Sequence, residues 1–274
     1  MKVLITGGNG NISKMISKNL STFYEITCIT RNDFDLLDFK DVSNYLSNKD
    51  FDVLIHTAIK GGRRTKEENG EVVYQNLLMF ENLIKFANKF KLIINFDSGA
   101  IYNRSTDIYC RKEDELINIP NDYYGFSKYL IYKRSLNYDN IVNFRIFNIF
   151  HINEEKDRFI KSCFCSKKNG TDVTIFQDKF FDFMYEDDFI IIIKYYLDNF
   201  NNIDKLKKTI NLSYDKKYKL SEIAEFILDK NNIKILNSEC NFNYCGDSTL
   251  LNELNLNLIG LEKSIQLYSQ QFTN

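Results

Sequence analysis

Residues 2–13 of the chain read KVLITGGNGNIS, and this stretch decides the fold. Its apolar part, Val3–Thr6, predicts a buried strand, and a helical pattern that continues to Leu20 follows the glycines. A strand, a glycine turn and a helix in this order present backbone N–H groups and a helix N-terminus to a pyrophosphate. Gly7 permits the tight turn and Gly10 lets phosphates approach the main chain, whereas Ser13 stands where a third glycine is usual. The sequence therefore predicts a dinucleotide-binding turn; the alternative is an ordinary glycine-rich turn.

Length and composition narrow the class of protein. The 274 residues have room for one large α/β domain or for a nucleotide domain with a smaller annex, and the formal net charge of −1 gives no basic field for nucleic acid. The opening residues lack a signal-peptide core and no apolar run is long enough to cross a bilayer, so we expect a cytoplasmic protein. The six cysteines are then expected to be reduced thiols. Cys163–Cys165 and Cys240–Cys245, with only two histidines in the chain, do not have the spacing of a zinc site, and we expect no metal.

Further apolar or β-branched runs predict more strands, with helical patterns between the early ones. They are Glu25–Thr30, Val53–His56, Leu92–Phe96, Ile141–Phe147, Val173–Phe176 and Thr209–Leu212. This alternation predicts an α/β fold, a Rossmann-type doubly wound parallel sheet covered on both faces. Ligands of such sheets bind outside the carboxyl ends of the strands, so the residues after each strand are the candidate site.

A second signal is the pair Tyr124 and Lys128, which lie on one face of a predicted helix at i, i+4 spacing. A tyrosine hydroxyl titrates near pH ~10, and a neighbouring ammonium favours its phenolate form. The pair is a candidate proton donor; the alternative is an exposed helix face.

These features belong to a longer series of motifs that stand in a fixed order. With them the chain resembles an extended short-chain dehydrogenase/reductase of the nucleotide-sugar epimerase/dehydratase/reductase group. The motifs are Thr6-Gly7-Gly8-x-Gly10, Asp35-Leu36, His56-Thr57-Ala58, Ser98-Gly99-Ala100-Ile101-Tyr102, Tyr124-x-x-x-Lys128, Arg145-Ile146-Phe147-Asn148 and Phe183-Met184-Tyr185-Glu186-Asp187-Asp188. Within the group, the stretches Thr30–Asp38, Ala58–Gly62 and Tyr74–Asn76 are most similar to GDP-fucose synthases.

The resemblance implies a domain plan. Residues 1–150 would form an NADP-binding Rossmann domain, to which residues 182–212 return, and residues 151–181 and 213–274 would form a small α/β substrate-binding lobe. The predicted helix over Glu71–Phe90 is apolar on more than one stripe. Its surplus apolar face would pair with the Tyr124–Tyr138 helix of a second subunit, as in similar enzymes, so a homodimer is expected.

The resemblance also assigns roles to residues. Ser98 would hydrogen-bond the sugar carbonyl or hydroxyl, Tyr124 would donate the proton, and Lys128 would bind the nicotinamide ribose and lower the pKa of Tyr124. The implied cofactor-binding residues are Gly7, Gly8, Asn9, Gly10, Asn11, Ile12, Arg31, Asp35, Leu36, Thr57, Ala58, Ile59, Lys60, Asn76, Tyr124 and Lys128. The implied substrate-binding residues are Ser98, Gly99, Ala100, Asn148, Arg158 and Lys179. Simpler roles stay open for Ser98 as a strand cap, Asp35 as a turn residue and Asn148 as a buried hydrogen-bonding residue.

The end of the second strand bears on the choice of cofactor. A carboxylate there accepts from the ribose 2′-OH of NAD, whereas the 2′-phosphate of NADP requires a cation. Thr30-Arg31 occupies this place, so NADP(H) is expected over NAD(H), with Asp33 as the nearby residue that would favour NAD(H).

The residues around Ser98 bear on the type of reaction. In similar dehydratases an Asp-Glu pair follows the catalytic Ser or Thr, but here Gly99 and Ala100 do. GDP-fucose synthases epimerise with a Cys at the position of Ala100 and a later His, for which the stretch Glu155–Ile160 offers only Arg158. The expected function is an NADPH-dependent C4 reductase of a nucleotide-activated 4-keto-deoxy sugar, without epimerisation, in surface-polysaccharide sugar biosynthesis. The alternatives are an NAD-dependent nucleotide-sugar 4-epimerase and a non-catalytic NADP-binding regulator.

The substrate nucleotide stays open at this stage. Relatives carry an Arg before Asp182 that grips the nucleotide diphosphate, and this chain has Phe181 there, so Lys179 or Arg158 would have to compensate.

Overall fold

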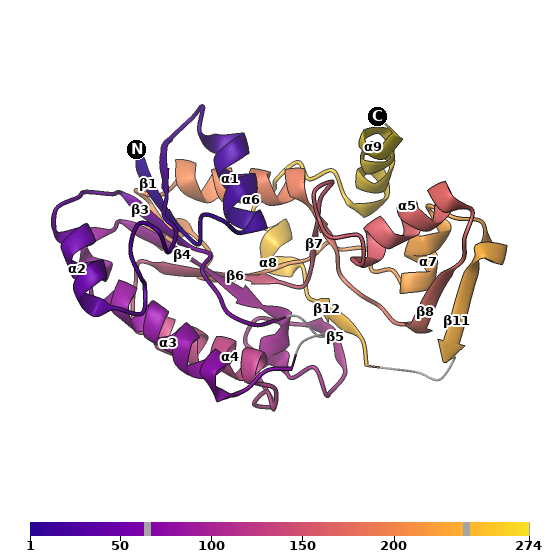
Figure 1. Cartoon of the computed structure of the whole chain (residues 1–274), viewed down its shortest axis with the longest axis horizontal. Coiled ribbons are helices and arrows are strands. Elements are labelled where there is room, and N and C mark those ends of the chain that lie inside the picture. Colours follow the sequence, from indigo (N-terminus) through magenta and orange to yellow (C-terminus); the bar gives the residue numbers. More distant parts are fainter. Residues whose placement is uncertain (63–66, 238–241, 274) are drawn as a thin grey trace. The chain divides into compact units, whose positions relative to one another are not determined.

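The computed structural model describes residues 1–62, 67–237 and 242–273, and the chain forms two compact units (Figure 1). Unit 1 comprises Met1–Asn103, Leu116–Arg145 and Ile192–Ile210. Unit 2 comprises Arg104–Glu115, Ile146–Ile191 and Asn211–Asn274. Every described helix is too short or too polar to traverse a lipid bilayer.

A six-stranded sheet runs through unit 1. Its strands are β1 (Lys2–Thr6), β2 (Glu25–Cys28), β3 (Val53–His56), β4 (Leu92–Ser98), β6 (Ile141–Ile146) and β10 (Thr209–Leu212). They lie in the order β10-β6-β4-β3-β1-β2. Strand β1 pairs in parallel with both β2 and β3, and β3 pairs in parallel with β4. Because β2 and β3 flank β1 on opposite sides, the carboxyl end of β1 is a topological switch point, where open α/β sheets bind ligands. The predicted doubly wound parallel sheet is confirmed.

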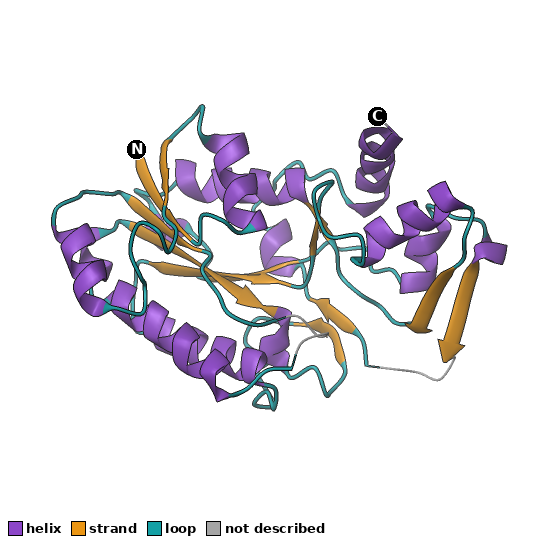
Figure 2. Cartoon of the chain, viewed as in Figure 1, coloured by secondary structure: helices purple, strands orange, loops and turns teal. Residues whose placement is uncertain are grey.

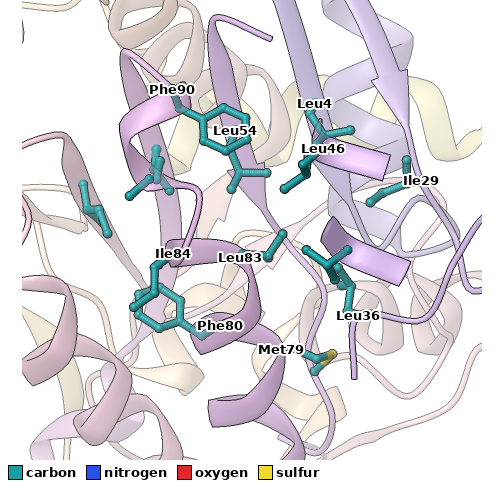
Figure 3. Packing of buried hydrophobic residues seen from close by; sticks show 14 of the residues in the cluster. Leu4, Ile29, Leu36, Leu46, Leu54, Met79, Phe80, Leu83, Ile84 and Phe90 are labelled. Atoms are coloured by element: carbon teal, nitrogen blue, oxygen red, sulfur yellow. The ribbon is translucent and has the colours of Figure 1, made fainter. Parts of the chain in front are cut away.

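Helices cover this sheet on both faces (Figure 1). Helices α3 (Gly70–Ile84) and α4 (Tyr123–Ser135) lie side by side along one face, and α1 (Asn11–Leu20) lies on the other. The core on the α3 side joins Leu4 of β1 and Leu54 of β3 to side chains of α2 (Phe39–Ser47) and α3 (Figure 3). Full burial of one such Leu or Phe side chain stabilises the fold by about 1.5–3 kcal/mol.

Two helix boundaries differ from the sequence prediction. The helix expected over Glu71–Phe90 ends at Ile84, and a separate 3-10 turn, η1 (Ala87–Lys89), follows it. Ala87 and Phe90 are nevertheless buried in the same core, so the apolar pattern continued beyond the point where the helical hydrogen bonds stopped. The helix expected over Tyr124–Tyr138 ends at Ser135.

Unit 2 is built from small sheets and short helices (Figure 2). Its two-stranded parallel sheets pair β8 (Val173–Gln177) with β11 (Ile233–Asn237), β12 (Tyr244–Gly246) with β5 (Ile108–Arg111), and β7 (Ile149–Phe150) with β9 (Met184–Tyr185). Its helices are α5 (Phe159–Asn169), α7 (Leu220–Glu225), α8 (Thr249–Asn252) and α9 (Leu261–Thr273), while α6 (Glu186–Asp198) belongs to both units. The remaining 3-10 turns are η2 (Gly99–Tyr102), η3 (Ile203–Lys205) and η4 (Lys230–Asn232). Phe150, Phe164, Tyr185 and Tyr268 are among the residues of a separate apolar core, which confirms the predicted small α/β lobe.

Candidate active site

The turn after β1 has the backbone conformation that the sequence predicts. Gly7 has a φ of +69°, and a Cβ at this position would lie 2.9 Å from the main chain of Ala58, so only glycine fits. Ser13 donates from Oγ to the carbonyls of Gly7 at 2.8 Å and Gly10 at 2.9 Å. The departure from a third glycine therefore has a role, since the serine ties the turn together. Gly10 caps α1 without a side-chain hydrogen bond, which leaves the first amides of this helix for an anion.

A pocket of about 310 Å³ opens beside this turn, within the range of small-molecule sites. It is formed by the turn, the end of β2 and the segment after β3. The lining residues are Gly7, Asn9, Gly10, Ile29, Thr30, Arg31, Phe34, Asp35, Leu36, Leu37, Thr57, Ala58, Ile59 and Met79. The tight turn at Gly7 and the uncapped start of α1 suit a bound pyrophosphate, so these residues fit a dinucleotide.

The two charged residues at the end of β2, Arg31 and Asp33, differ in their contacts. Thr30 donates from its backbone N at 2.7 Å and from Oγ1 at 2.9 Å to one oxygen of Asp33, and these bonds lower the pKa of Asp33. Asp33 is therefore engaged in the turn. Arg31 is exposed, lines the pocket and has no ion pair among the described residues.

Several predicted cofactor residues lie behind the pocket lining. Asn76 is fully buried; its Oδ1 accepts from Lys60 N at 2.8 Å, and its Nδ2 donates to Lys60 O at 3.0 Å and to Ser127 Oγ at 3.1 Å. Asp35 does line the pocket, and its Oδ1 accepts from the backbone of Leu37 at 3.0 Å, which is the alternative turn role. Asn76 thus supports the segment that lines the pocket. The other predicted cofactor residues outside the lining are Gly8, Asn11, Ile12, Lys60, Tyr124 and Lys128.

The pair Tyr124 and Lys128 occupies the first turns of α4. Lys128 is only 6 % exposed, and its Nζ lies 5.8 Å from the centre of the Tyr124 ring. This ammonium donates to Phe96 O at 2.5 Å. Burial lowers the pKa of Lys128 to about 8, while the carboxylate of Asp97 acts in the opposite direction. The side chain is thus charged at neutral pH in a nearly dry site.

Ser98 ends β4 close to the start of α4. It is 7 % exposed, and its Oγ accepts from Ala100 N at 3.2 Å, so it caps η2, whereas the simpler interpretation from the sequence was a strand cap. A Cβ at Gly125 would lie 2.8 Å from the carbonyl of Ala100. Only a glycine lets α4 begin so close to η2, the turn that Ser98 caps.

Two buried polar pairs of this site were not predicted. Arg145 is fully buried, and its Nε donates to Asp97 Oδ2 at 2.9 Å. A single Arg inside the apolar run Ile141–Phe147 was the available signal, because a charge in a buried strand requires a partner. His56 Nδ1 lies 2.9 Å from Thr6 Oγ1. Burial, and secondly the ammonium of Lys128, lower the pKa of His56 to about 3, so the imidazole is neutral.

The remaining predicted substrate residues belong to unit 2. Arg158 donates from Nη2 to Asn148 Oδ1 at 3.0 Å, so these two meet. Lys179 lies with its Nζ 5.9 Å from the ring centre of Phe181, the residue that replaces the relatives' Arg. Among the described residues no three His, Cys, Asp or Glu side chains gather as metal ligands would. Cys240, one of the spaced cysteines, lies outside the described residues.

Fold and site together define a dinucleotide-dependent enzyme of the extended short-chain dehydrogenase/reductase type, and comparison with known proteins gives its family. Residues 3–213 match the NAD dependent epimerase/dehydratase family, and the chain belongs to that family. The predicted family is confirmed.

The individual proteins that match the chain have low sequence identity to it. The chain is 25% identical to GDP-L-colitose synthase of Yersinia pseudotuberculosis over an alignment of 311 positions, which covers 100% of this chain and 98% of that protein. A GDP-mannoheptose C4 reductase from Campylobacter jejuni, solved with NADP bound, has a TM-score of 0.81 and 17% identity, covering 100% of this chain and 98% of the other. A dTDP-4-dehydrorhamnose reductase ortholog from Clostridium acetobutylicum has a TM-score of 0.83 and 15% identity, covering 100% of both chains. These structures share the fold of this protein.

Proposed function

We propose that the protein is an NADPH-dependent C4 reductase of a nucleotide-activated 4-keto-deoxy sugar. The observation that carries this proposal is the chemistry around Ser98. Ser98 and Lys128 are buried and Tyr124 is half-buried on the first turn of α4, whereas Gly99 and Ala100, which follow Ser98, have no group that exchanges a proton. Such a site supports hydride addition with one protonation, and it lacks beside Ser98 the acid and base that elimination or epimerisation requires.

The pocket at the end of β1 supports NADP(H) as the cofactor. Arg31 lines it as an exposed cation suited to a 2′-phosphate, while Asp33, which would favour a 2′-OH, is held by Thr30. Bound NADPH would supply the hydride that reduces the C4 carbonyl.

The protein's own residues would then supply geometry and the proton. Ser98 holds the carbonyl oxygen, and Tyr124 donates its phenolic proton to that oxygen as the alcohol forms. Lys128 is charged below pH about 8, so its ammonium favours the phenolate that remains on Tyr124. Asp97, held by Arg145, favours the ammonium form of Lys128.

The choice of a nucleotide sugar rests on the relatives. The names GDP-L-colitose synthase and GDP-mannoheptose C4 reductase describe enzymes of GDP-activated sugars. In this chain Asn148, Arg158 and Lys179 would contact the substrate, with the two cations replacing the missing Arg beside Asp182. We assign cofactor binding to residues 1–150 with 182–212, and substrate binding to residues 151–181 and 213–274. A homodimer is part of the same proposal, through α3 and α4.

The proposal is tested by incubating the protein with NADPH and a panel of GDP-, CDP-, dTDP- and UDP-4-keto-deoxy sugars. For at least one substrate we expect oxidation of NADPH, followed by its absorbance, together with formation of the C4 alcohol. No turnover across the panel would contradict it. Tightly bound NAD, released on denaturation, together with sugar interconversion without net redox change, would instead establish the 4-epimerase alternative.

A further inference from the structure

Side chains form hydrogen bonds with both the backbone N–H and the backbone carbonyl of Tyr124. Glu68 accepts the Tyr124 N–H through Oε2 at 3.2 Å, and the same carboxylate accepts the Gly62 N–H through Oε1 at 2.5 Å. Ser127 donates from Oγ to the Tyr124 carbonyl at 2.8 Å. Glu68 therefore joins the backbone of Gly62 to the first turn of α4.

Two consecutive glycines make this arrangement possible. Gly62 has a φ of +91°, and a Cβ there would lie 2.9 Å from Cε2 and 3.0 Å from Cζ of Tyr124. Gly61 has a φ of +84°, and a Cβ there would lie 2.6 Å from Glu68 Oε1. The backbone of Gly62 thus lies directly against the ring carbon that carries the Tyr124 hydroxyl.

The segment after β3 is also tied to α4 at its other end. Asn76 binds both the N–H and the carbonyl of Lys60, and it donates to Ser127 Oγ, which in turn donates to the Tyr124 carbonyl. Ala58 and Ile59, just before Lys60, line the dinucleotide pocket. Hydrogen bonds therefore connect the lining of this pocket to the main chain of Tyr124.

An ordinary helix cap does not account for Glu68. Asp122 already caps α4 by accepting the Gly125 N–H at 2.8 Å. The second oxygen of Glu68 accepts from the N–H of Gly62, which lies outside the helix. The backbone of Gly62 in turn lies against the ring of Tyr124.

We propose that Glu68 is a positioning residue for proton transfer, and that it orients the Tyr124 phenol by holding its backbone and the Gly62 backbone together. This inference rests on the proposed function of Tyr124 as proton donor. A displaced hydroxyl slows reduction while leaving the dinucleotide pocket intact. Asn76 and Ser127 hold the same turn from the carbonyl side.

The kinetic test uses the full-length protein with NADPH and whichever 4-keto sugar the wild type reduces. Glu68→Gln keeps one acceptor oxygen for two donors, and Glu68→Ala keeps none. Because small misplacements of reacting groups cost up to about 100-fold in rate, we expect kcat to fall about tenfold for Glu68→Gln and further for Glu68→Ala. The KM for NADPH should stay within about twofold of wild type, because neither variant alters the residues that line the pocket. The matched control is Glu67→Gln, an exposed neighbour expected to keep wild-type kinetics.

Unchanged kcat in both Glu68 variants would overturn the inference. So would a parallel loss of kcat, NADPH binding and melting temperature, since that pattern marks a purely structural residue.

A second measurement requires no substrate. Amide hydrogen exchange reports whether the N–H groups of Tyr124 and Gly62 are bonded. We expect faster exchange at both in Glu68→Gln than in wild type or Glu67→Gln, with the amides of β1 and β4 unchanged. Equal exchange in all three proteins would refute the positioning role. If the wild type reduces none of the sugars, the proposed function fails, and this measurement still decides whether Glu68 holds Tyr124.

Discussion

At the scale of single residues, the site depends on a buried ammonium beside a phenol. Lys128 is removed from water by α4 and β4, and its main partner is a backbone carbonyl, Phe96 O. Burial of a charge disfavours that charge, which is why its pKa falls to about 8. The same burial keeps water away from the ammonium, whose Nζ lies 5.8 Å from the centre of the Tyr124 ring.

Removal of the Tyr124 hydroxyl separates chemistry from binding. The variant Tyr124→Phe keeps the ring against Gly62 and loses the proton donor. General acids contribute about 10²–10⁴-fold to rate, so we expect at least a 100-fold loss of NADPH oxidation with an unchanged Kd for NADPH. Titration of cofactor fluorescence measures the Kd for NADPH, and a steady-state assay measures NADPH oxidation. Wild-type turnover by this variant would exclude Tyr124 as the donor.

Replacement of Lys128 by an apolar residue is expected to stabilise the protein while it abolishes activity. The pKa of Lys128 is about 8 in the folded protein and about 10.4 in the unfolded chain. Between these values the unfolded state binds more protons, so this group makes stability rise with pH, and its burial is unfavourable below pH 8. Lys128→Met should therefore raise the free energy of unfolding at pH 7 by about 1–3 kcal/mol.

Urea unfolding of the wild type and Lys128→Met at pH 7 and pH 10 checks this prediction. The gain should shrink at pH 10, where the wild-type lysine is neutral when folded and partly neutral when unfolded. A variant less stable than the wild type at pH 7 would show that the lysine's hydrogen bond to Phe96 outweighs the cost of burying its charge.

At the scale of elements, the sequence predicted those that consist of consecutive buried residues. Strands β3 and β4 are buried along their whole length, so their apolar runs are continuous and easily recognised. The same signal overextended α3, because the apolar residues Ala87 and Phe90 reach the core from a 3-10 turn. The apolar periodicity of the sequence indicates which residues are buried, and buried residues continue beyond the point where helix α3 ends.

The strands of unit 2 other than β8 escaped prediction for the opposite reason. Strand β12 has three residues, and its partner β5 lies about 135 positions earlier in the chain, as the bond from Cys110 N to Cys245 Sγ shows. Neither segment has a pattern of its own, because each becomes a strand only when the other pairs with it.

The candidate site likewise has residues that the sequence predicted and residues that it did not. The glycine turn, Arg31, Thr57 and Ala58 line the pocket as the motif order indicated. Glu68 and the Asp97–Arg145 pair were not predicted, because their importance depends on partners that meet them only in the folded chain.

At the scale of the whole molecule, cofactor binding couples to stability. A ligand that binds only the folded state stabilises it by RT ln(1 + [L]/Kd), about 2.7 kcal/mol at 100 times Kd. Because Arg31 is exposed at the pocket and Asp33 is engaged by Thr30, we expect NADPH to raise the melting temperature more than NADH at equal concentration. Thermal unfolding with each cofactor measures this.

The matched variant for this prediction is Arg31→Gln, which should narrow the difference between the two cofactors by weakening only NADPH. A larger shift with NADH in the wild type would reverse the cofactor assignment.

The sequence by itself determined the β1 strand, the glycine turn and the α1 helix, and the order of the motifs that follow. These depend on local sterics and on runs of buried residues, which can be read along the chain. The tertiary structure alone decided that Ser13 ties the glycine turn together, that Asn76 supports the pocket from behind, and that Glu68 holds Tyr124. The physical reason is that these hydrogen bonds join residues that are 6, 16 and 56 positions apart, so each depends on where the fold places both partners.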